Sequence, residues 1–118
     1  MAGWTLCMSA PPMYGRGSEA SPDLRRARDL VRRGGLGEVV FCRMLQDSVA
    51  EAAASLRFLF DGAAPVSVAA QEDGRGTLRY AGFVASCETS KWDEIVLCGT
   101  QATLVVNRGG LRLHRRPG

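Results

Sequence analysis

The spacing of apolar residues changes near Pro65, and this change restricts the possible folds more than any other feature of the chain. Before Pro65, two segments repeat apolar residues at helical spacing, and one strand-like segment lies between them. After Pro65, short β-like segments separated by turn residues continue to the end. This order predicts an α+β fold with two helices packed on one face of a mostly antiparallel sheet of about five to six strands.

Local signals give the expected bounds of these elements. Ser21 and Pro22 are typical of a helix N-cap and first helical position, and Gly34 ends that helix. Ser48 and Glu51 form a capping box for the second helix, which ends near residues 61–62. The expected strands cover residues 39–47, 66–71, 77–87, 92–98, 103–106 and 111–115, with hairpin turns at 72–76 and 107–110.

The length of 118 residues allows one hydrophobic core, so we expect a single domain over residues 1–118. Residues 4–8 are apolar and predict a short strand, and a Pro/Gly-rich loop follows them, so that residues 1–21 precede a core at 22–115. Two pairings of that first strand remain open: it pairs within its own subunit, or it is swapped between the two subunits of a dimer.

Composition excludes several classes of function. No apolar run reaches the ~18 residues needed to cross a bilayer, and the N-terminus lacks a basic leader region, so a cytoplasmic protein without membrane contact is expected. The densest group of arginines lies at residues 25–33 and contains no aromatic residue, which favours a solvated helix face over a nucleic-acid site. The four cysteines are widely spaced and His114 is the only histidine, so no metal-ligand pattern is present.

Large apolar residues occur on both faces of several expected strands. Strict alternation over residues 39–47 puts Val40, Cys42 and Met44 on one side, and Val39, Phe41, Arg43, Leu45 and Asp47 on the other. Two helices cover only one face of a sheet. We therefore expect the other face to form a homodimer interface or to shape a ligand cavity.

Three segments resemble, in order, the substrate-binding C-terminal domain of the glucose-fructose oxidoreductase and inositol dehydrogenase (Gfo/Idh/MocA) family. Residues 27–39 are similar to its helix, "G-x-hydrophobic-G-E" turn and first sheet strand. Residues 56–62 with 65–68 are similar to its "wall-G…P-x-x-V" segment, and residues 99–104 to its "G-T-x-G-x-l" strand turn. The resemblance implies a sheet that binds a sugar or polyol and dimerises face to face.

The same resemblance implies that the family's hydride transfer is missing here. Family members bind NAD(P) on an N-terminal Rossmann domain, which this sequence lacks, and their substrate lysine would fall before Met1. Residues 34–37 are rich in glycine, but they follow a helix and precede a strand, opposite to a dinucleotide fingerprint. The family's His and Asp positions fall on Glu51 and Ala54, or one residue later. We therefore expect no cofactor and no autonomous NAD(P)-dependent dehydrogenase.

Six residues are candidates for a site, and each also has a structural interpretation. Glu51 either replaces the family histidine or only caps its helix. Arg43 and Asp47 either orient a polar ligand or form a surface ion pair. Tyr80 and Trp92 either line a ligand cavity or pack in the core. His114 lies near a basic C-terminal end, and with Asp47 and Glu51 it is a weak catalytic candidate.

Three functions remain open. The first is a dimeric module that binds a small polar or sugar-like metabolite or assembles with a separate Rossmann-domain subunit. The second is a cofactor-independent isomerase, lyase or cyclase of small-molecule metabolism that uses a recycled substrate pocket. The third is a relic or fragment without chemistry.

Overall fold

The computed structural model describes residues 21–91 and 93–116 of the chain. Within these residues two helices and a seven-stranded sheet form an α+β fold, which confirms the predicted class with more strands than expected. The elements are α2 (Pro22–Arg32), β2 (Val39–Gln46), α3 (Val49–Leu59), β3 (Ser67–Ala70), β4 (Gly76–Arg79), β5 (Val84–Thr89), β6 (Glu94–Gly99), β7 (Ala102–Asn107) and β8 (Gly110–Arg115). The predicted strand at residues 4–8 lies outside the described residues.

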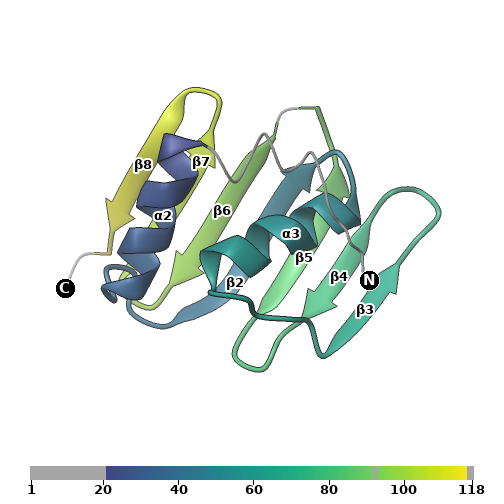
Figure 1. Ribbon diagram of the computed structural model, residues 1–118, viewed down its shortest axis with the longest axis horizontal. Helices are drawn as coiled ribbons and strands as arrows, with labels where there is room; N and C mark the ends of the chain where they lie inside the picture. Colours follow the sequence, from purple (N-terminus) through teal and green to yellow (C-terminus); the bar gives the residue numbers. More distant parts are fainter. Residues whose placement is uncertain (1–20, 92, 117–118) are drawn as a thin grey trace.

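The sheet has the strand order β3-β4-β5-β2-β6-β7-β8, with β2 at its centre. The β2–β5 pair is parallel and every other pair is antiparallel. Both helices lie on the same face of this sheet (Figure 1). Helix α2 contacts β7 and β8, whereas α3 contacts β2 and β5, so the core forms between one helical layer and one sheet layer.

Both predicted helix starts are confirmed. The Ser21 hydroxyl accepts a hydrogen bond from the Leu24 N–H at 3.4 Å, and the Ser48 hydroxyl accepts one from the Glu51 N–H at 3.1 Å. These bonds satisfy amide groups that have no partner within a first helical turn. Serine and proline signals therefore positioned both helices correctly.

Strand β2 corrects the predicted faces of two residues. The register with β6 shifts between Val39 and Phe41, which indicates a β-bulge. The extra residue places Val39 in the core at 9% exposure and leaves Val40 48% exposed. The alternation from Cys42 onward is as predicted. Strict alternation failed here because a bulge has no signature in the apolar pattern.

The strand predicted over residues 77–87 is wrong. The chain turns at residues 80–83, where the Tyr80 N–H donates to the Phe83 carbonyl at 2.9 Å, and β4 and β5 pair as a hairpin. Tyr80 stacks on Phe83 with ring centroids 4.5 Å apart. Tyrosine and phenylalanine both have high β propensity, so the residue pattern predicts a continuous strand and does not reveal the turn between them.

The glycine-rich segment after α2 packs against the turn that joins β6 to β7. Gly34 and Gly37 have φ of +74° and +73°, as a helix end and the turn after it require. The Thr100 hydroxyl accepts from the Glu38 N–H at 3.0 Å, and the Thr100 N–H donates to the Glu38 carbonyl at 2.9 Å. Two sequence motifs far apart in the chain thus form one packed junction.

The two helices are also joined to each other at their C-terminal ends. Arg32 on α2 donates through Nε and a terminal nitrogen to the Asp61 carboxylate just after α3. This hydrogen bond lowers the pKa of Asp61 and raises that of Arg32. The Arg28 guanidinium lies over the Phe58 ring, 4.2 Å from its centroid. Both contacts fix α3 relative to α2.

Neither helix in the described part of the chain is long and apolar enough to span a membrane.

Candidate functional site

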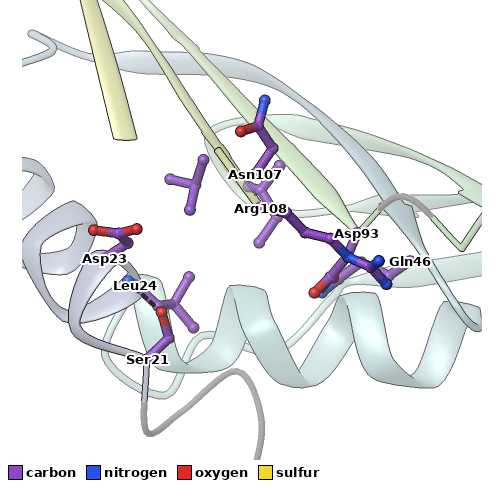
Figure 2. A pocket seen from close by; sticks show the side chains of 9 residues that line it. Ser21, Asp23, Leu24, Gln46, Asp93, Asn107 and Arg108 are labelled. Carbon is purple, nitrogen blue, oxygen red and sulfur yellow. Dashed lines mark hydrogen bonds between the residues drawn. The ribbon is translucent and has the colours of Figure 1, made fainter. Parts of the chain in front are cut away.

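A cavity of about 240 Å³ lies between the start of α2 and strands β6 and β7, on the helical side of the sheet. Figure 2 shows Ser21 and Asp23 on the α2 side of this cavity and Gln46 and Asp93 at its other end. Its apolar lining residues are Leu24, Ile95 and Val106. The cavity therefore has an apolar middle with polar groups at both ends.

Gln46 is the main polar group of this cavity that belongs to the core. It is the last residue of β2, and alternation from Met44 turns its side chain towards the helices, where it is 2% exposed. Its Nε2 donates to the Asp93 carboxylate at 3.1 Å, whereas its Oε1 has no hydrogen-bond partner among the described residues. A buried amide oxygen without a partner costs about 1–3 kcal/mol.

Asp93 holds its position through an uncommon backbone conformation. Its φ is +55°, in the left-handed region that aspartate tolerates better than most residues. Backbone in this region is found disproportionately at binding sites. Here it sets the Asp93 carboxylate against the Gln46 amide at the edge of the cavity.

Asn107 and Arg108, which line the top of the cavity, already have partners. The Asn107 amide donates to the Glu94 carboxylate at 3.1 Å and accepts from the Gly109 N–H at 2.8 Å. A terminal nitrogen of Arg108 donates to the Lys91 carbonyl at 2.9 Å. These bonds position the β7–β8 turn.

The predicted polar candidates near α3 lie outside this cavity lining. Asp47 is exposed in the connection from β2 to α3, and no ion pair joins it to Arg43. Glu51 is half-buried in the first turn of α3, where its backbone N–H donates a hydrogen bond to the Ser48 hydroxyl. Ala54, at the other position implied by the family resemblance, carries no polar group. Trp92 lies outside the described residues.

Tyr80 lies in the core near the β4–β5 turn. It is 8% exposed, and its hydroxyl has no hydrogen-bond partner among the described residues. Burial raises the pKa of this phenol, and the neighbouring Cys87 and Cys42 add to that effect. Its ring completes a cluster with Phe83 and Phe60, whose centroids are 4.6 Å apart. Its observed contacts are those of packing.

Arg43 and His114 lie on the sheet face opposite the helices, which we call the open face. No described element covers this face. Two further strands, β6 and β7, separate β2 from β8, so the two strands lie about 14 Å apart across the sheet. The structure therefore does not bring the described candidates together. They are divided between the β2–α3 connection, α3, the core and the open face.

The open face has an apolar centre with charges around it. Phe41 is 40% exposed there and neighbours Val84 and Cys98 on the adjacent strands. Val96 and Val105 pair across the next two strands and are half-buried. The charged residues of the same face are Arg43, Arg79, Glu88, Glu94 and Arg112.

Sequence reasoning missed Gln46 and Asp93. A signal for Gln46 was present, because it continues the buried alternation of Cys42 and Met44, where a polar residue needs a partner. Asp93 carried no such signal, since its backbone conformation cannot be read from the residue type.

A metal or thiol centre has no support in the described part of the chain. Three or more histidine, cysteine or acidic side chains do not gather there in an arrangement able to hold a metal ion. Cys42, Cys87 and Cys98 are free thiols, and the first two are buried. Burial raises the pKa of Cys42 to about 12 and that of Cys87 to about 11, which keeps both thiols protonated and unreactive at neutral pH.

No family model and no curated protein matches this sequence. Solved structures do match its fold. An oxidoreductase from Pseudomonas syringae superposes with a TM-score of 0.70 at 16% identity, over 90% of this chain and 39% of its own. An inositol dehydrogenase homolog from Azotobacter vinelandii, complexed with NADH and myo-inositol, gives 0.70 at 14% identity, over 90% and 40%.

A third neighbour is the WlbA dehydrogenase from Bordetella pertussis, in complex with NADH and UDP-GlcNAcA. It gives a TM-score of 0.63 at 13% identity, over 83% of this chain and 45% of its own. The chain thus spans less than half the length of these proteins. The resemblance inferred from residues 27–39, 56–68 and 99–104 is confirmed at the level of fold: this chain has a fold found within Gfo/Idh/MocA-type oxidoreductases.

Proposed function

We propose that this protein is a cytoplasmic, dimeric module that binds a small polar metabolite, in which two copies meet through their open faces. The observation that carries the proposal is the uncovered apolar centre around Phe41, Val96 and Val105. A sheet face of this kind in contact with water favours association, because pairing two such faces buries apolar surface.

The charges around this centre support a second copy as the occupant. A two-fold interface brings the same surface to both sides, so it needs residues of both signs in one patch. The open face carries the acidic Glu88 and Glu94 at one end of its central strands, and Arg79 and Arg112 on its outer strands. Opposite charges at the rim set the orientation of two copies more than they add to affinity.

The cavity beside Gln46 supports the binding role. It lies on the helical face, so it stays accessible when the open faces are paired. Its volume of about 240 Å³ suits a ligand smaller than a nucleotide cofactor. A separate Rossmann-domain subunit is a further partner of this proposal, because the matched oxidoreductases contain more than twice the matched length.

Replacing Phe41 with glutamate tests the interface. A carboxylate at the centre of a dry interface is costly without a partner, whereas at an exposed site on a monomer it is hydrated. We expect Phe41→Glu to sediment as a monomer at concentrations where the unmodified protein is a dimer, with unchanged far-UV circular dichroism.

Val68→Glu is the matched control. Val68 is 56% exposed, but it pairs with Leu78 and thus belongs to the helical face. This variant is expected to remain dimeric. If Phe41→Glu stays dimeric, or if both variants dissociate equally, the open face is not the interface.

A further inference from the structure

The outer edge of β3 is unpaired in the described part of the chain. β3 is the last strand at its end of the sheet, and no described element pairs with its outer side (Figure 1). The Gln71 N–H donates to the Arg75 carbonyl at 2.8 Å, and hydrogen bonds alternate along an antiparallel ladder. By this alternation Val68 and Ala70 direct their backbone N–H and C=O groups away from β4. A further strand can form a ladder on them.

An apolar strip lies next to this edge. Val66 is 73% exposed and Val68 is 56% exposed, and both lie with Ala70 on the helical face. We call these three residues the β3 strip. Helix α3 contacts β2 and β5 and leaves the strip exposed. The opposite face of β3 carries only the small residues Ser67 and Ala69. A strand that fits this edge therefore has apolar side chains on one face and small ones on the other.

The opposite edge of the sheet, at β8, is protected against a further strand. Arg112 and Arg115 are exposed on β8, and charged side chains on an edge strand oppose pairing. The apolar Leu111 and Leu113 pack against the core, and α2 contacts the strand. β3 has no charged residue and no such cover. Of the two edges, β3 is the one that needs an occupant.

Residues 4–8 have the pattern that the β3 edge requires. They are uncharged, and alternation divides them into large apolar and small side chains: Trp4, Leu6 and Met8 on one side, and Thr5 and Cys7 on the other. Beside β3, the large side chains would lie next to the β3 strip on the helical face. The small ones would continue the opposite face. A slip of one residue would reverse both faces, so the pattern also sets the register.

The chain between residues 4–8 and α2 is long enough for this pairing within one subunit. Residues 9–20 form the connection, and 12 extended residues span about 40 Å. Helix α2 contacts β7, which lies five strand spacings from β3, or about 24 Å. The β3 edge is therefore within reach of the same chain, and a second copy is not needed to supply the strand.

From these observations we infer that residues 4–8 add a further strand to the outer edge of β3 in their own subunit, with Leu6 on the same face as Val68. This pairing covers the β3 strip and removes the unprotected edge of the sheet. It is independent of the proposed dimer, which uses the open face.

Amide hydrogen exchange of the full chain, followed by NMR, tests this pairing. The Val68 N–H points to the free edge, whereas the Ala69 N–H points to β4 and serves as an internal reference. We expect the Val68 N–H to exchange at least roughly tenfold more slowly than an unprotected amide, because the added strand bonds it. We also expect nuclear Overhauser effects between the methyl groups of Leu6 and Val68.

Two aspartate variants separate the pairing from a general effect of charge. Leu6→Asp places a carboxylate against the β3 strip, where burial without a partner is costly. It should speed exchange of the Val68 N–H at least roughly tenfold and leave that of Ala69 unchanged. Met13→Asp adds the same charge to the connection at residues 9–20, so it should leave both exchange rates unchanged.

Three results would overturn the inference. Fast exchange of the Val68 N–H in the unmodified protein would show that the edge stays open. Slow exchange that persists in Leu6→Asp would show that something other than residues 4–8 covers it. In a mixture of chains labelled only on leucine or only on valine, an Overhauser effect between Leu6 and Val68 would show that the strand is swapped between copies.

Discussion

Replacing Gly99 with alanine is expected to lower the free energy of unfolding by about 3 kcal/mol or more, the upper range for overpacked interiors. A Cβ at this position would overlap the Leu36 carbonyl oxygen and lie 2.8 Å from the Leu36 Cβ. Leu36 is fully buried, and its carbonyl accepts from the Gln101 N–H at 2.9 Å, so it cannot move without breaking that bond. The packed junction between the segment after α2 and the β6–β7 turn would therefore have to open.

Gly82→Ala is the control for this prediction. Nothing lies within 4 Å of a Cβ at Gly82, and its φ is not in the left-handed region. Alanine there should leave stability unchanged or raise it slightly, because it restricts the unfolded chain. Urea titrations of both variants at one protein concentration measure the difference. Should Gly99→Ala unfold within about 1 kcal/mol of the unmodified protein, the close packing on Leu36 is not a constraint.

The second large effect is a loss of stability at alkaline pH that comes from the buried thiols. Burial raises the pKa of Cys42 from 9.0 to about 12, and neighbouring Cys98 and Cys87 add to the shift. Burial also raises the pKa of Cys87 from 9.0 to about 11. Above pH 9 the unfolded chain ionises both thiols while the folded chain does not. Their contribution is therefore fully present below pH 9 and is lost as the pH rises towards each folded pKa.

Between about pH 9 and pH 10 each thiol lowers the free energy of unfolding by about 1 kcal/mol, and the two together lower it by about 2 kcal/mol. Above about pH 10 the buried Tyr80 phenol, whose pKa is also raised, adds to the loss. Urea titrations under reducing conditions, repeated at rising pH, give this slope. The double variant Cys42→Ala/Cys87→Ala should lose most of this slope below pH 10. Cys98→Ala keeps both buried thiols and removes only a secondary contribution to the Cys42 pKa, so it should keep most of the slope. An equal slope in all three proteins would show that other groups cause the alkaline loss.

The sequence predicted those parts of the fold that depend on local chemistry. Ser21 and Ser48 marked helix starts because their hydroxyls accept first-turn amides, and glycines marked the turns at residues 72–76 and 107–110. The parallel β2–β5 pair was not predictable, because it depends on contacts between segments about 40 residues apart rather than on local pattern. The bulge at Val40 and the turn after Tyr80 were not predicted either. A bulge leaves no mark on the apolar pattern, and the residues on both sides of the turn favour strands.

The candidate site was less predictable than the fold. Arg43, Asp47, Glu51 and His114 are the residue types that suggest chemistry. They are nevertheless divided between β2, the β2–α3 connection, α3 and the distant strand β8. The cavity instead depends on Gln46, whose importance comes from burial, and on Asp93, whose position comes from a left-handed backbone. Both properties arise from tertiary packing. Of the two residues, only Gln46 could be recognised from the sequence, because it is a polar residue on the buried face of β2.

The central proposal for this protein is that two copies cover each other's open faces. Sedimentation equilibrium of the unmodified protein at tens of micromolar tests it most directly. We expect a mass of twice the 12.7 kDa of one chain, falling towards one chain only on strong dilution. A mass of 12.7 kDa throughout this range would contradict the account and leave the open face to another partner.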